Sequence, residues 1–104
     1  MTAANKARGE ASLVVGGETL VLRPTFEALC AAEEELGPLF GLVERAADGG
    51  LSIREIVALF DHVSVATRPA AIDRARIGEA VVARGLADVT PVLRGLLHEI
   101  LKGQ

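Results

Sequence analysis

A glycine pair between two short apolar runs limits the N-terminal part of this chain to one local structure. The runs are residues 12–15 and 19–22, and Gly16-Gly17-Glu18 joins them. Glycine supplies the positive φ angles that a tight hairpin turn requires, so the pattern predicts a two-stranded β-hairpin. An isolated hairpin is only marginally stable in water, so this one must pack against apolar surface from the rest of the chain.

The rest of the chain has the apolar spacing of helices. We expect helices over residues 26–36, 39–47, 53 to about 66, 73–84 and about 88–101. Local signals set their ends: Thr25 caps the first helix, Gly37 stops it, and Ser52 with Glu55 forms a capping box before the third. Pro91 is expected in the first turn of the last helix, where its missing N–H costs little.

Each expected helix has one apolar face. In the first helix this face holds Phe26, Leu29, Cys30 and Leu36, and in the third it holds Ile53, Ile56, Val57, Phe60 and Val63. The predicted fold is therefore α+β and mostly α, with the hairpin packed on a bundle of four to five short helices. We expect residues 12–102 to form a single domain, preceded by a flexible tail over residues 1–11.

Composition favours a protein that binds other proteins. Half of the residues are apolar, yet only three are aromatic and the formal net charge is −3. A small fold has few places to bury so much apolar surface, so we expect an exposed patch of the kind that marks a partner surface. The acidic balance argues against a nucleic-acid partner, and no apolar run is long enough for a membrane helix or a signal segment.

The potential metal ligands do not form a recognisable set. They are His62, His98 and Cys30, and no two of them have the spacing of a zinc site. A single cysteine also excludes an internal disulfide. Gly49-Gly50 lacks the lysine and the strand-to-helix context of a phosphate-binding loop. We therefore expect no metal and no cofactor.

Three further features suggest chemistry but have simpler interpretations. Asp61 and His62 are adjacent and point about 100° apart on a helix, so we interpret them as two solvated polar residues. Cys30 lies mid-helix among carboxylates rather than cations, so we interpret it as a small buried hydrophobic residue, not a nucleophile. The run 33–35 of three glutamates fans around its helix, which favours a solvated acidic edge or a charged rim beside a partner surface. No enzymatic activity is expected.

Two segments resemble a known family. They are LRPTFEALCAAEEELG over residues 22–37 and LSIREIVALF over residues 51–60. Together with the hairpin they resemble the small tail proteins of bacterial gene transfer agents and related prophages, often described as phage tail tube proteins of the gene-transfer-agent type. The resemblance extends over about residues 9–101. It implies a role in building a phage-like tail, in the bacterial cytoplasm during assembly or as part of the particle.

The resemblance leaves the exact role open. Tail tubes of such viruses are rings of β-rich subunits, whereas tail assembly chaperones are small, largely helical proteins that coat the tape-measure protein. The order of elements favours a chaperone or accessory protein that binds the tape-measure or other tail proteins, or that forms homo-oligomers. The alternatives are a structural tube component and a regulatory interaction module, unrelated to phage, whose hairpin pairs edge to edge with another chain.

The partner surface is expected on the later helices. We predict contacts from Leu97 and Leu101 of the last helix and from the flank of the third helix at Leu59. Glu34 and Glu35 would form a charged rim. An apolar groove at this place would hold an amphipathic helix of the partner.

Overall fold

The computed structural model describes residues 11–102, in which a β-hairpin is followed by five helices. The elements are β1 (Ala11–Val15), β2 (Glu18–Leu22), α1 (Phe26–Leu36), α2 (Leu39–Ala47), α3 (Ile53–Ser64), α4 (Arg74–Arg84) and α5 (Leu86–Lys102). This confirms the predicted α+β, mostly α fold. The expected N-terminal tail lies outside the described residues, except for Ala11, which is the first residue of β1.

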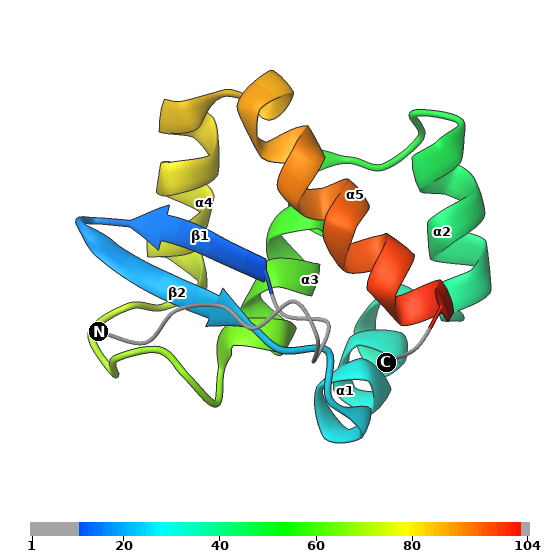
Figure 1. Ribbon diagram of the computed structural model, residues 1–104, viewed down its shortest axis with the longest axis horizontal. Coiled ribbons are helices and arrows are strands. Elements are labelled where there is room, and N and C mark those ends of the chain that lie inside the picture. The colour runs from blue at the N-terminus through cyan, green and yellow to red at the C-terminus, as the bar shows by residue number, and fades with distance from the viewer. Residues whose placement is uncertain (1–10, 103–104) are drawn as a thin grey trace.

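The hairpin has a two-residue turn and pairs from Ala11 with Leu22 to Val15 with Glu18. Gly16 and Gly17 have φ angles of 57° and 82°, the type I′ geometry whose twist matches that of the strands. One face of the hairpin is buried through Leu13, Val15, Leu20 and Leu22. β1 contacts α4 and α5 and β2 contacts α3, so the helices supply the apolar support that the hairpin needs (Figure 1).

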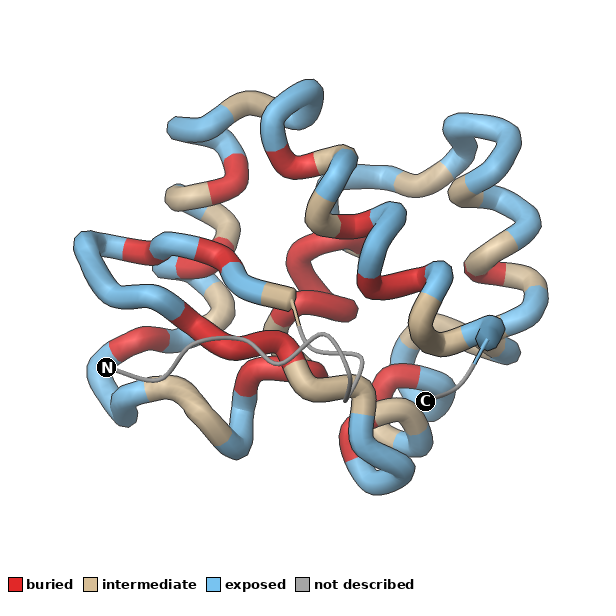
Figure 2. Tube along the Cα trace, viewed as in Figure 1, coloured by how far each residue is buried: buried red, intermediate tan, exposed pale blue. Residues whose placement is uncertain are grey.

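The centre of the core is α3, which contacts α1, α4 and β2. Its buried residues are Ile56, Val57, Ala58, Leu59, Phe60, Val63 and Ser64. α5 crosses in front of α3 and buries Val89, Leu93, Leu96 and Leu97 (Figures 1 and 2). In contrast, α2 lies at one side of the molecule and has a single buried residue, Leu42.

The predicted helix ends are confirmed where they depend on local caps. The Thr25 hydroxyl accepts a hydrogen bond of 3.1 Å from the backbone N–H of Ala28, and the N–H of Gly37 bonds back to α1. Ser52 and Glu55 form the complete capping box at the start of α3. These are the interactions that satisfy the free N–H and C=O groups at helix ends.

The position of Pro91 was predicted wrongly. α5 begins at Leu86, so Pro91 lies inside the helix rather than in its first turn. The reason is that Gly85, at a φ of 90°, is the only residue between α4 and α5, and its carbonyl accepts the N–H of Val89 to open α5 early. The missing N–H of Pro91 leaves the carbonyl of Ala87 without its helical partner, and Ala87 is exposed to water.

The apolar face of α1 was also predicted wrongly in part. Cys30 is exposed, and so is Phe26, with 85% of its surface accessible. The residues of α1 that are buried are Ala28 and Ala32. α1 packs closely on α3, and its small alanine side chains allow that approach while the larger Phe26 points outward.

Candidate functional site

A groove lies between α2 and α5, two helices that do not pack closely against each other. We call it the α2–α5 groove; its volume is about 540 Å³. It is lined by Val43, Ala46, Ala47, Gly49, Leu51, Ile56, Leu86, Thr90, Leu93, Arg94, Leu97, His98 and Leu101. In Figure 1, α5 runs from beside α4 across the middle of the molecule toward α2, and the segment between α2 and α3 passes behind α5.

The floor of the α2–α5 groove belongs to the hydrophobic core. Ile56, Leu93 and Leu97 retain 9%, 8% and 7% of their accessible surface, and all three line this groove. Leu86 and Leu101 are half exposed at its two ends, at 50% and 54%. The groove therefore continues the core to the surface, so an apolar partner placed there would extend the core.

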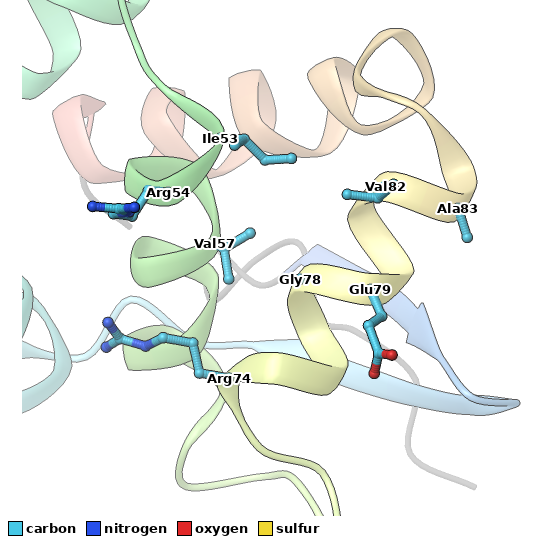
Figure 3. Close-up of a pocket in the computed structure, with 8 residues that line it drawn as sticks. All are labelled: Ile53, Arg54, Val57, Arg74, Gly78, Glu79, Val82 and Ala83. Carbon is cyan, nitrogen blue, oxygen red and sulfur yellow. The ribbon is translucent and has the colours of Figure 1, made fainter.

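A second groove, the α3–α4 groove, lies between the first turns of α3 and the side of α4 that faces them. Its volume is about 580 Å³, and its apolar lining residues are Ile53, Val57, Val82 and Ala83. Figure 3 shows Ile53 and Val57 of α3 pointing toward α4, with Val82 pointing back at them. Gly78 faces Val57 across the floor. Arg54, Arg74 and Glu79 supply charges of both signs along this groove.

The structure brings together only two of the predicted partner residues. Leu97 and Leu101 both line the α2–α5 groove. Leu59 is fully buried in the core, so its side chain is not available to a partner of the folded domain. Glu34 and Glu35 lie on α1 and line neither groove.

Glu35 belongs instead to an ionic cluster that joins α1, α3 and α4. We define the cluster as Glu35, Asp61, His62, Arg68 and Arg74. Arg74 donates two hydrogen bonds to Glu35, of 2.6 and 2.8 Å, and two to Asp61, of 3.1 and 3.0 Å. Arg68 pairs with Asp61, and Nε2 of His62 lies 2.7 Å from Oε1 of Glu35.

The charges of the ionic cluster stabilise one another. Hydrogen bonds from Arg74 and then from His62 lower the pKa of the Glu35 carboxyl from 4.5 to about 2. Hydrogen bonds to Glu35 and Asp61 raise the pKa of Arg74 in return. Because two carboxylates face two guanidinium groups and a histidine, the cluster holds three helices together through charge-assisted hydrogen bonds.

The cluster corrects the interpretation of Asp61 and His62 as solvated polar residues. Both side chains are largely buried, and each bonds to a residue from another helix or from the segment that follows α3. His62 bonds to Glu35, and Asp61 bonds to Arg68 and Arg74. Both side chains therefore belong to the ionic cluster although they bind different members of it. Within residues 11–102, no group of three His, Cys, Asp or Glu residues is placed to hold a metal ion.

A family model described as "Phage tail tube protein, GTA-gp10" matches residues 8–103. The chain belongs to this family. The match extends over nearly the whole chain and confirms the resemblance to phage tail proteins of gene transfer agents. Neither the search of curated proteins nor the search of solved structures gave a significant match. No helix in the described part of this GTA-gp10 family member is long and apolar enough to span a membrane.

In this GTA-gp10 family member, the sequence did not indicate which residues form the wall of the α2–α5 groove opposite α5. The apolar spacing of residues 39–47 predicts a helix, but nothing local marks Val43, Ala46 and Leu51 as neighbours in a groove with Leu97. The available signal was the large apolar fraction of the chain, which indicates that some apolar surface stays open without saying where.

Proposed function

We propose that this protein acts in the assembly of a phage-like tail by binding a helical segment of another tail protein in the α2–α5 groove. The observation that carries the proposal is the groove itself, where the apolar core reaches the surface over the length of α5. Grooves of this kind bind amphipathic helices through apolar residues spaced three and four apart. The tape-measure protein is the proposed partner, and the role requires no enzymatic activity.

Strand content supports an assembly role over a place in the tube wall. Between residues 11 and 102 the sheet has two strands of five residues each. A wall built from β-rich subunits needs more strands than this hairpin offers. The tube component remains the second candidate, because the description of the matching family is that of a tail tube protein.

The test of the groove is a binding measurement between the purified protein and a tape-measure protein from the same genome. Leu86→Glu and Leu101→Glu place a charge on the half-exposed ends of the groove. Each is expected to weaken binding about tenfold, because a charge in an apolar contact is poorly solvated. Val82→Glu is the matched control: its side chain is similarly exposed, at 67%, but it lines the α3–α4 groove.

Two results would contradict the proposal. Equal loss of binding in the Val82→Glu variant and in the groove variants would remove the α2–α5 groove as the site. Purified particles that contain this chain in the copy number of a ring subunit would favour the tube component, and quantitative mass spectrometry of the particles measures that number.

A further inference from the structure

The described lining of the α2–α5 groove holds one charged side chain, Arg94, and one histidine, His98. Both side chains are exposed, and no carboxylate from residues 11–102 belongs to this lining. They are four residues apart on α5 and therefore lie one turn apart along the same side of the helix. This local basic edge contrasts with the net charge of −3 of the whole chain.

Arg94 and His98 are also free to bind something else. Neither forms a hydrogen bond or ion pair with another residue in the described part of the chain. Arg45, Arg68 and Arg74, in contrast, are each paired with a carboxylate. Two side chains with free hydrogen-bond donors beside an apolar groove favour a partner that carries hydrogen-bond acceptors at the same spacing.

The two walls of the groove differ in side-chain size. The α5 wall carries leucines at 86, 93, 97 and 101. The opposite wall has Val43, Ala46 and Ala47 of α2 and Gly49 from the segment after α2. Small residues on one wall leave room that only a partner with large apolar side chains can fill. The lining of α5 runs from residue 86 to residue 101, a length of about 22 Å, which suits a partner helix of about four turns.

We infer that the α2–α5 groove binds an amphipathic helix that is acidic along one flank. Its apolar stripe fills the space beside the small residues of α2, and carboxylates four residues apart on its flank pair with Arg94 and His98. This inference rests on the proposed function and adds the chemical class of the partner segment. It predicts that basic or uncharged amphipathic helices bind more weakly at this site.

The test uses overlapping 20-residue peptides that cover the tape-measure protein, titrated against the full chain. The peptides that bind are expected to carry Asp or Glu pairs at i and i+4 beside an apolar stripe. The double variant Arg94→Glu/His98→Glu is expected to bind them about tenfold more weakly, because the ion pair with Arg94 and the hydrogen bond with His98 are both replaced by repulsion between carboxylates. Arg76→Glu, an exposed change of charge on α4 outside both grooves, is the control and is expected to bind as the wild type does.

A charge exchange separates electrostatic pairing from damage to the fold. A copy of the best-binding peptide with its carboxylates replaced by lysine is expected to bind the double variant better than the wild type. Binding of the original peptide to the wild type is expected to weaken as salt is raised, because exposed charge pairs are screened.

The outcomes distinguish this inference from the function on which it rests. Peptides that bind without carboxylates, or that bind the double variant as well as the wild type, overturn the inference and leave the proposed function standing. A dimer of this chain that is dissociated by Leu101→Glu also overturns it, because a second copy then occupies the groove. If neither the peptides nor the intact tape-measure protein bind, the proposed function fails as well.

Discussion

At the scale of single residues, the Glu35–Arg74 pair connects parts of the chain that are distant in sequence. Glu35 lies at the end of α1 and Arg74 at the start of α4, and Asp61 and His62 of α3 bind to them from between. Arg68, from the segment between α3 and α4, bonds to the carboxylate of Asp61 and to the buried hydroxyl of Ser64. The cluster thus fixes the path of that segment as well as the angle between the helices.

Because the pKa of the Glu35 carboxyl is lowered in the folded protein, the stability of the protein is expected to fall at acid pH. The pKa of this carboxyl is about 2 in the folded protein, against an ordinary value of 4.5. The unfolded chain therefore binds more protons in this interval, so the contribution of Glu35 is complete above about pH 4.5 and is lost as the pH falls toward about 2. We expect Glu35→Gln to lower the free energy of unfolding at neutral pH by about 1 kcal/mol.

The measurement for Glu35 is thermal unfolding followed by circular dichroism at a series of pH values. Glu35→Gln is expected to flatten the loss of stability between about pH 4.5 and about pH 2 relative to the wild type. Glu34→Gln is the control, since Glu34 is exposed and has no bonded partner in the described residues. An equal effect of the two substitutions would show that the ionic cluster does not carry this pH dependence.

At the scale of elements, the hairpin depends on the two glycines of its turn. An added Cβ at Gly16 or Gly17 meets no atom of the described residues within 4 Å, so these residues leave space for a side chain at both positions. The constraint is the backbone: φ is 57° at Gly16 and 82° at Gly17. Asparagine tolerates the first of these angles and is common at that position of a type I′ turn, whereas alanine is strained at positive φ.

Two substitutions in the turn are therefore expected to differ. Gly17→Ala should lower the free energy of unfolding by about 1 to 2 kcal/mol, because a Cβ is strained at positive φ. Gly16→Asn should change it by less than about 0.5 kcal/mol. Urea denaturation of both variants measures these values, and a loss from Gly16→Asn as large as that from Gly17→Ala would contradict the type I′ description of the turn.

At the scale of the whole molecule, burial is concentrated around α3, and the helices at the periphery keep apolar side chains in contact with water. The three phenylalanines make this uneven distribution clear: Phe60 is fully buried, while Phe26 and Phe40 are among the most exposed large apolar residues of the described chain. α2 has only Leu42 in the core, so it covers little of α5 and leaves the α2–α5 groove open. The loose packing of α2 on α5 therefore buries little apolar surface and leaves the candidate binding surface exposed.

The same substitution, phenylalanine to alanine, can be compared at a buried and at an exposed position. Phe60→Ala removes a side chain with 0% exposure and is expected to lower the free energy of unfolding by about 3 to 5 kcal/mol. Phe40→Ala, at 76% exposure, is expected to change it by less than about 0.5 kcal/mol. Chemical denaturation measures both. A large loss from Phe40→Ala would mean that α2 packs more tightly than described, for example against a second copy of the chain.

Several features followed from the sequence because they depend on residues close to one another along the chain. The glycine pair predicted the hairpin, and Thr25, Gly37 and the Ser52–Glu55 capping box set helix ends that the structure confirms. The helix pattern after the hairpin gave the mostly α fold class. Each of these rests on backbone hydrogen bonds and φ angles within a few residues, which a local pattern specifies.

Only the tertiary structure decided which apolar residues face the core and which polar residues meet. Cys30 and Phe26 share the periodicity of a buried face but point outward, because the close packing of α1 on α3 is made by alanines. Asp61 and His62 find their partners on other elements, and the α2–α5 groove needs two helices from distant parts of the chain to lie side by side without packing. Helix periodicity fixes an apolar stripe, but the neighbours that cover it depend on how all the elements pack together.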